Sequence, residues 1–290
     1  MSISAEPASP VPDPGSEEPS RARRTGRNLP VAIVTGLILA GAIFGTLFSS
    51  RLAWFLLLAA AVLMAQVEFY RVLRTKGYRP ADALGLAGGA LLLIGAYQRG
   101  PAALSFGLST IALASFLWFL VDRHRERVVQ SLGITLLGVI YVPFLGAHVQ
   151  LMRDLPDGIV ITLSYIGLVA FYDIAAYAAG SIIGRRPMAR SVSPKKSWEG
   201  AFGATFFIFV LALAVGPMLA PFDAGSSIIL AVIVAVLAPL GDLAESLIKR
   251  DLGVKDMGAL LPGHGGMLDR IDALLLVAPA YYWVVRVLVT

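Results

Sequence analysis

The sequence of 290 residues has no cysteine, only three histidines and few charged residues, which make up 15% of the chain. Without cysteine, the chain can form neither a disulfide nor a thiolate metal site. Three scattered histidines are too few for a histidine-rich metal site. Soluble domains usually hold about 25% charged and 45 to 50% apolar residues, whereas 57% of this chain is hydrophobic. The composition therefore argues against a water-soluble fold.

Apolar runs of about 20 residues recur along the chain, and a helix of that length, at about 1.5 Å per residue, crosses a hydrocarbon core of about 30 Å. The sequence thus predicts an all-α, polytopic integral membrane protein with about nine transmembrane helices. The predicted spans are residues 29–48, 52–70, 83–97, 101–121, 128–152, 159–184, 201–222, 226–248 and 273–289.

The composition divides the chain into three parts. Residues 1–28 are rich in proline and charge and predict a disordered cytoplasmic tail, too long and too acidic for the start of a signal peptide. Residues 29–158 are expected to form the N-terminal spans. Their notable polar residues, Glu68 and His148, lie near span ends, where interfacial or structural roles are expected. Residues 159–290 are expected to form the catalytic region.

Lysine and arginine are unevenly distributed among the predicted loops. Basic residues accumulate in short cytoplasmic loops, and all but four of the 24 fall in alternate segments, beginning with the tail. This pattern predicts a multi-pass protein of the inner (plasma) membrane with a cytoplasmic N-terminus, an outer C-terminus and its active site on the cytoplasmic side. The basic segments are residues 21–27, 71–82, 122–127, 185–200 and 249–272, and the exceptions are Arg51, Arg99, Arg153 and Arg286.

Past residue 170, ionisable residues accumulate inside or beside the apolar runs, where each is costly unless paired or bound to a metal. Asp173 and Tyr177 share a helical face with Gly180 and Gly184, and such glycines let another helix approach closely. Asp173 and Tyr177 are therefore candidates for substrate binding. The alternative for Asp173 is a buried carboxyl group held by a tyrosine or serine hydroxyl.

The predicted loop that follows contains a compact run of hydroxyl and ammonium groups that could bind phosphate oxygens. No Gly-Lys-Ser/Thr sequence is present, so this is not a Walker A loop. A loop that only orients the protein by its charge is the alternative. Lysine usage favours phosphate binding, because orientation needs only positive charge and the chain has 19 arginines but 5 lysines. Four of the five lysines lie in the two long polar loops: Lys195, Lys196, Lys249 and Lys255. The candidates in the first of these loops are Ser193, Lys195, Lys196 and Glu199.

The eighth predicted span reaches the cytoplasm through Pro239 and Gly241, which are expected to kink the helix and free backbone carbonyls. Glu245 and Lys249 are spaced for an ion pair along the helix. Asp242 has no cation three or four residues further on, which favours a metal or substrate role. The residues that share this face are Asp242, Glu245, Ser246 and Lys249.

Asp269 and Asp272 lie one helical turn apart at the expected start of the last span, so their carboxylates face one way beside free helix N–H groups. Carboxylates together with substrate phosphates are typical ligands of Mg²⁺. Glycines beside His264 would let the backbone approach a phosphate closely. His264 itself is as compatible with bracing the loop as with catalysis. The glycines are Gly263, Gly265 and Gly266.

These motifs resemble the signature of the CDP-diacylglycerol synthase (phosphatidate cytidylyltransferase) family, which reads Ser, two residues, Lys-Arg, four residues, Lys-Asp, then Pro-Gly-His-Gly-Gly and Asp-Arg-x-Asp. The match fixes over ten positions within 27 residues. The runs 193–200 and 241–245 are similar to the family's upstream motifs. The resemblance covers residues 170–290 well and the tail not at all. The matching residues are Ser246, Lys249, Arg250, Lys255, Asp256, Pro262, Gly263, His264, Gly265, Gly266, Asp269, Arg270 and Asp272.

The resemblance implies an enzyme of phospholipid biosynthesis that converts CTP and phosphatidate to CDP-diacylglycerol and pyrophosphate by Mg²⁺-assisted in-line transfer. Its expected partners are both substrates and membrane lipids, with no nucleic acid, and it is compatible with a homodimer. We expect Asp242, Asp269 and Asp272 to hold Mg²⁺. The expected catalytic residues are Lys196, Lys249, Arg250, Lys255, Asp256, His264 and Arg270. The expected substrate-binding residues are Asp173, Tyr177, Ser193, Lys195, Glu199, Glu245, Ser246, Gly263, Gly265 and Gly266.

Three other functions require sequence features that can be compared with this chain. A CDP-alcohol phosphotransferase needs Asp-Gly-x-x-Ala-Arg, but Asp157-Gly158 is followed by Ile-Val-Ile-Thr. A polyprenyl-phosphate sugar transferase favours an Asp-Asp pair, and the sequence has none. A cation- or proton-coupled transporter using Asp173 and Asp242 is the non-enzyme alternative. A transporter does not need the lysines and glycines of 193–200 and 249–266, which favours the enzyme.

Overall fold

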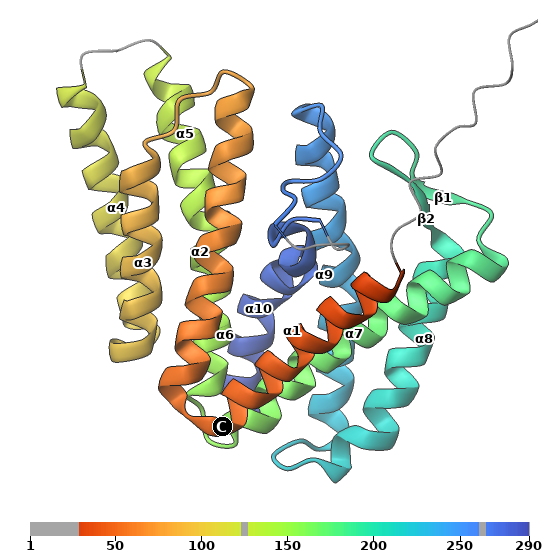
Figure 1. Ribbon diagram of the computed structural model, residues 1–290. Coiled ribbons are helices and arrows are strands. Elements are labelled where there is room, and N and C mark those ends of the chain that lie inside the picture. The colour runs from red at the N-terminus through yellow and green to blue at the C-terminus, as the bar shows by residue number, and fades with distance from the viewer. Residues whose placement is uncertain (1–28, 123–126, 261–264, 290) are drawn as a thin grey trace, which may run out of the picture.

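The computed structural model describes residues 29–122, 127–260 and 265–289, and most of this part of the chain is helical. The predicted tail, residues 1–28, lies outside the described residues. Seven described helices are long and apolar enough to cross a membrane. This confirms an all-α polytopic membrane protein (Figure 1). All nine predicted spans are helical, but α1 and α3 are not among the seven, so the count of nine remains a prediction.

The N-terminal half forms a group of helices that pack on their neighbours in sequence. The fifth predicted span is interrupted by a single π-helical turn around Pro143, whose missing N–H cannot continue the regular hydrogen-bond ladder. The elements are α1 (Leu29–Ser49), α2 (Arg51–Thr75), α3 (Asp82–Arg99), α4 (Ala102–Val121), α5 (Val128–Val139), the π-turn (Ile140–Phe144) and α6 (Leu145–Arg153).

The C-terminal half contains four long helices, of which α7 packs along α8 and α9 along α10. The α10 helix also contacts α2, α6 and α7, and its buried side chains include Tyr281 and Tyr282. The start of α10, which carries Asp269 and Asp272, is therefore fixed against both halves of the molecule. The elements are α7 (Gly158–Ile183), α8 (Trp198–Val215), a 3₁₀ turn (Gly216–Met218), α9 (Ala224–Asp251) and α10 (Leu268–Leu288).

Residues 185–200, predicted to be a loop, instead contain a two-stranded antiparallel hairpin, β1 (Pro187–Ala189) and β2 (Ser193–Ser197). The next helix begins at Trp198, three residues before the predicted span, because the Ser197 hydroxyl accepts a hydrogen bond from the Gly200 N–H (3.1 Å) and caps the helix. The hairpin gives Lys195 and Lys196 a defined backbone position.

The α9 helix runs through Pro239 without ending. Gly241 serves helix packing: a Cβ atom at this position would lie 2.9 Å from the Ala273 Cα and 3.0 Å from the Asp272 carbonyl oxygen. This contact brings Asp242 on α9 beside the first turns of α10.

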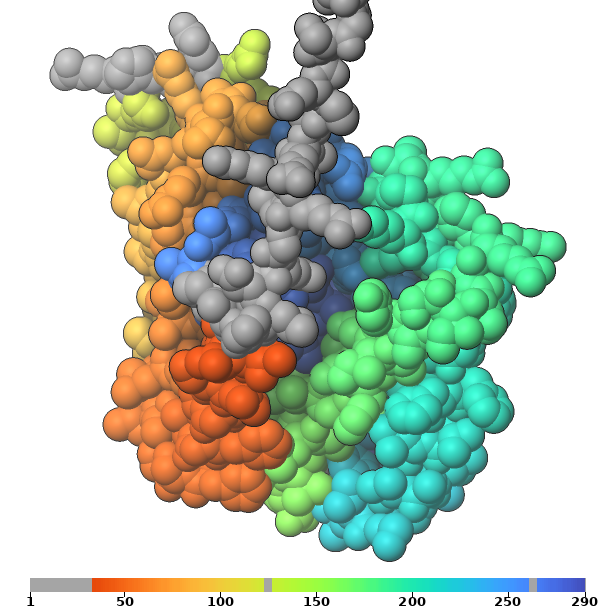
Figure 2. All heavy atoms as spheres, turned by 45° about the vertical axis from the view of Figure 1, so that its right-hand side comes forward, coloured from red at the N-terminus to blue at the C-terminus, as the bar shows by residue number. Residues whose placement is uncertain are grey.

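The connections α2–α3, α7–α8 and α9–α10 all lie at the upper end in Figure 1, whereas α6–α7 and α8–α9 lie at the lower end. The segments expected to carry the chemistry are therefore at one end of the helices. In Figure 2 the blue C-terminal part of the chain is visible between the orange N-terminal helices and the green and cyan helices α7 and α8.

Candidate active site

Close packing of α7 on α8 positions the hairpin over the membrane helices. A Cβ atom at Gly200 would lie 2.8 Å from the Ala176 carbonyl oxygen and 3.2 Å from the Gly180 Cα. The prediction that small residues on α7 admit a second helix is thus confirmed. The consequence is that β2, which leads directly into α8, lies near Asp242 on α9.

Lys196 on β2 forms an ion pair with Asp242 on α9. Asp242 has no cation three or four residues further on along its own helix. The structure supplies one from the hairpin. Both side chains remain partly accessible, at 25% for Lys196 and 37% for Asp242, so each can still reach a ligand.

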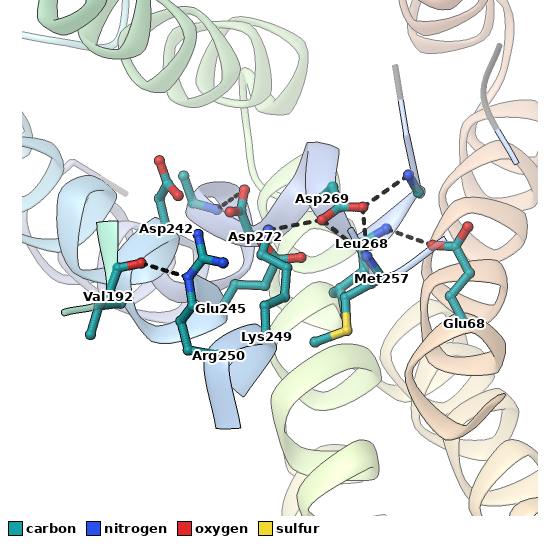
Figure 3. Close-up of polar contacts among 12 residues, drawn as sticks. Glu68, Val192, Asp242, Glu245, Lys249, Arg250, Met257, Leu268, Asp269 and Asp272 are labelled. Carbon is teal, nitrogen blue, oxygen red and sulfur yellow. Dashed lines mark hydrogen bonds and ion pairs between the residues drawn. The ribbon is translucent and has the colours of Figure 1, made fainter. Parts of the chain in front are cut away.

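A second, more deeply buried chain of charges links α9 to α10. Lys249 forms ion pairs with Glu245, as the helical spacing predicted, and with Asp269, whose Oδ1 lies 2.9 Å from the Lys249 Nζ (Figure 3). The Glu245 side chain is fully buried, and its Oε1 has no hydrogen-bond partner in the described part of the chain. A buried carboxylate oxygen without a donor is costly, which makes Glu245 a group that a cation or a proton would stabilise.

Asp272 and Asp173 complete a group of carboxylates at the same level. Asp272 is 8% exposed and accepts a hydrogen bond from the Ala273 N–H (2.8 Å). Its charge interacts with those of Glu245 and Asp242. Asp173 on α7 is exposed, and its charge interacts with those of Asp242, Asp272 and Lys196. The charges of two lysines thus interact with those of five carboxylates, listed here as Asp173, Asp242, Glu245, Asp269 and Asp272.

The predicted metal ligands do not form a ready-made cluster. Within residues 29–122, 127–260 and 265–289, no group of three or more histidine, aspartate or glutamate side chains is arranged to hold a metal ion. Asp269 is turned away to Lys249 and to the N–H groups of Met257 (3.0 Å) and Gly266 (2.9 Å). Asp242 is paired with Lys196, and Asp272 accepts the hydrogen bond from the Ala273 N–H; both are labelled in Figure 3.

Glu68 lies beside this region, a contact that the sequence does not indicate. An interfacial or structural role is expected for it, and its Oε2 accepts a hydrogen bond from the Leu268 N–H (3.0 Å) at the start of α10. A carboxylate inside an apolar span requires a partner, and this requirement is the signal for such a contact. His148 also makes structural contacts: its Nδ1 lies 2.9 Å from the Phe144 carbonyl oxygen and its ring packs on Tyr282.

The other expected residues divide by their present contacts. Glu199 accepts hydrogen bonds from the N–H groups of Arg185 and Arg186, so its carboxylate braces the hairpin. The Arg250 Nε donates to the Val192 carbonyl oxygen (3.1 Å), which ties α9 to the hairpin. Tyr177 is 81% exposed. Lys195, Lys255, Asp256 and Arg270 are exposed and Ser193, Ser246 and Gly265 are half-buried, whereas Gly263 and His264 lie outside the described residues.

Comparison with known proteins gives consistent results. Residues 30–288 match the cytidylyltransferase family. The chain is 32% identical over 269 residues to a phosphatidate cytidylyltransferase of Mycobacterium leprae, covering 87% of this chain and 86% of that protein. It is 33% identical to the protein of that name from Mycobacterium bovis, covering 91% and 90%. A Synechocystis protein of the same name is 29% identical, covering 89% and 94%.

Proposed function

The chain belongs to the cytidylyltransferase family, and we propose that it transfers the cytidylyl group of CTP to phosphatidate, giving CDP-diacylglycerol and pyrophosphate. The matches run across most of the chain and favour this enzyme over the transporter. The observation that carries the proposal is the convergence of three separate segments at one end of the helices. The hairpin brings Lys196 to Asp242 of α9, and Lys249 joins α9 to Asp269 of α10.

The excess of carboxylate in this group supports a requirement for Mg²⁺. Phosphatidate and CTP are both anionic, and their approach to several carboxylates at low dielectric needs a compensating cation. Asp242 and Asp272 would hold the ion, with the unpaired Glu245 Oε1 as a further oxygen nearby. When bound, Mg²⁺ would neutralise charge that develops on the transferring phosphoryl group. Asp269 is the third expected ligand; it is paired with Lys249, as Asp242 is with Lys196, and it also holds the ends of the α9–α10 connection.

The proposed step is an in-line displacement at the α-phosphorus of CTP. A bond forms from a phosphate oxygen of phosphatidate to this phosphorus, while the bond from the phosphorus to the bridging oxygen of the β-phosphate breaks and pyrophosphate leaves. Lys196 would bind a phosphate oxygen, because its ammonium is compact and remains accessible beside Asp242. No covalent enzyme intermediate is required, so Ser193 and Ser246 would act as hydrogen-bond donors.

A direct assay tests this function. Purified protein is given radiolabelled CTP, phosphatidate and Mg²⁺ in detergent. Label is expected to move into the organic phase only when phosphatidate is present, with release of one pyrophosphate per lipid product. Label that stays in the aqueous phase under these conditions would overturn the proposal.

A further expectation concerns the side of the membrane on which the site lies. The distribution of basic residues supports a cytoplasmic site and a cytoplasmic N-terminus. Because the chain has no cysteine, single cysteines can report accessibility. We expect Ser191→Cys, on the exposed hairpin, to react with a membrane-impermeant maleimide only after cells are permeabilised, and Ala224→Cys, exposed at the other end, to react in intact cells. The reverse pattern would place the site outside.

A separate prediction concerns the shape of the cation at position 196. Lys196→Arg keeps the charge but replaces a compact ammonium with a larger planar group that can bind Asp242 in a bidentate way. We expect a loss of activity of at least about tenfold, or about 1.4 kcal/mol. Lys76→Arg, at an exposed lysine after α2, is the matched control and is expected to be neutral. Normal turnover by Lys196→Arg would favour a loop that only orients the protein.

A further inference from the structure

Glu68 lies on α2, in the N-terminal half of the chain, which supplies none of the other charged groups of the site. Its carboxylate is only 6% exposed, and its Oε2 reaches a backbone N–H 200 residues away, that of Leu268 (Figure 3). Its second oxygen, Oε1, has no hydrogen-bond partner within the described residues. A buried carboxylate in an apolar helix is costly, and the hydrogen bond from the Leu268 N–H offsets part of that cost.

Two glycines of the α9–α10 connection are packed directly on this carboxylate. A Cβ atom at Gly266 would lie 2.7 Å from the Glu68 Oε2 and 2.8 Å from the Asp269 Oδ2, and a Cβ atom at Gly258 would collide with the Glu68 Oε1. Real Cβ atoms essentially never approach other atoms this closely. The absence of a side chain at Gly266, which the sequence suggested would admit a phosphate, is therefore already required by these two carboxylates.

Asp269 holds the same backbone from the other side. It accepts hydrogen bonds from the N–H groups of Met257 and Gly266, and its Oδ1 is paired with Lys249. Two segments of the connection, residues 257–258 and 265–268, are thus held between the carboxylates of Glu68 and Asp269. Displacement of either end would move Asp269, and with it Lys249 and Glu245.

We propose that Glu68 is a positioning residue, which fixes the two ends of the α9–α10 connection to α2 and so keeps Asp269 and Lys249 in place for nucleotidyl transfer. The inference rests on the proposed function for its effect on activity, but the contact itself can be tested independently. What positions the connection is the acceptor oxygen and the shape of the side chain, not a direct contact with substrate.

The test uses the lack of cysteine in the chain. Met257→Cys, at a position 2% exposed, reports release of the connection, and Val234→Cys, fully buried in the middle of α9, reports general unfolding. Each reporter is combined with Glu68→Met, which has no acceptor, and with Glu68→Gln, whose amide oxygen can still accept from Leu268. Maleimide labelling rates are measured on detergent-solubilised protein, together with kcat and KM for CTP.

We expect Glu68→Met to speed labelling at position 257 at least about tenfold, to leave position 234 protected, and to lower kcat by at least about tenfold. Glu68→Gln is expected to stay within about threefold of the parent in both measurements. Gly258→Ala, which collides with an unaltered Glu68, should also release position 257, whereas Gly133→Ala, with nothing within 4 Å of the added Cβ, should not.

Unchanged labelling at position 257 in Glu68→Met would overturn the proposal, as would equal acceleration at position 234, which would show that Glu68 maintains the whole fold. A Glu68→Gln protein as impaired as Glu68→Met would also overturn it, because charge would then matter more than the hydrogen bond. If labelling responds as expected but the parent protein transfers no cytidylyl group, the positioning contact stands and the proposed function fails.

Discussion

Asp272→Asn is expected to reduce Mg²⁺-dependent cytidylyl transfer by at least about a hundredfold, which corresponds to about 2.7 kcal/mol of transition-state stabilisation. Asn keeps the size of the side chain and the oxygen that accepts from the Ala273 N–H, but it removes the charge that a hard cation requires. Folding should survive. Asp272 is buried and its charge is repelled by those of Asp242 and Glu245, so loss of one negative charge relieves repulsion within this group.

The Mg²⁺ dependence of activity distinguishes loss of a metal ligand from other causes of low turnover. If Asp272 binds the ion, the variant should need a higher Mg²⁺ concentration for half-maximal activity as well as losing turnover. Asp242→Asn is expected to behave in the same way. Asp157→Asn is the matched control, because this exposed residue lies far from the site and has a positive φ of 54°, which Asn adopts readily. A folded, monodisperse Asp272→Asn protein with normal activity and Mg²⁺ dependence would exclude Asp272 as a ligand.

The helical architecture could be predicted from hydropathy because each span must satisfy its own backbone hydrogen bonds in the membrane. Every predicted span contains helix, although the helical residues of the predicted span 201–222 end at Met218. The differences between prediction and structure lie at the ends of the helices, where local side-chain contacts decide the structure. The hairpin at 187–197 contains Pro194 and two lysines, which are poor strand residues, so propensity gave no signal for it. The early start of α8 depends on a single cap by Ser197, a contact that hydropathy does not report.

The sequence predicts which residues belong to the candidate site better than it predicts which of them contact one another. Helical spacing found the Glu245–Lys249 pair because both residues lie on one helix. It could not find Lys196 beside Asp242, since that pair depends on how α7 and α8 place the hairpin. The same limit applies to Glu68, whose partner Leu268 comes from a helix at the other end of the chain. Contacts between distant segments are set by packing, which one sequence does not reveal.

The largest effect on stability is expected for Lys249→Met. Lys249 is the cation shared by Glu245, whose side chain is fully buried, and Asp269, whose side chain is 5% exposed. Removal of one partner from a buried ion pair typically costs about 3 to 5 kcal/mol, because the remaining charge is left uncompensated. We expect the temperature of half-inactivation in detergent to fall by at least about 5 °C and activity to be nearly lost. Lys76→Met, at the exposed lysine after α2, should change neither.

A second substitution shows whether uncompensated charge is the cause. In Lys249→Met/Glu245→Gln the more deeply buried carboxylate is neutral, and Asp269 keeps its hydrogen bonds from Met257 and Gly266. The double variant should therefore recover at least half of the lost thermal stability, although its activity should stay low because the cation is still absent. The single variant Glu245→Gln is measured as well. If the loss of thermal stability in the double variant equals the sum of the losses in the two single variants, Lys249 and Glu245 are not coupled. The instability of Lys249→Met would then come from lost packing of the lysine side chain, and the charged link between α9 and α10 would not be what holds the site together.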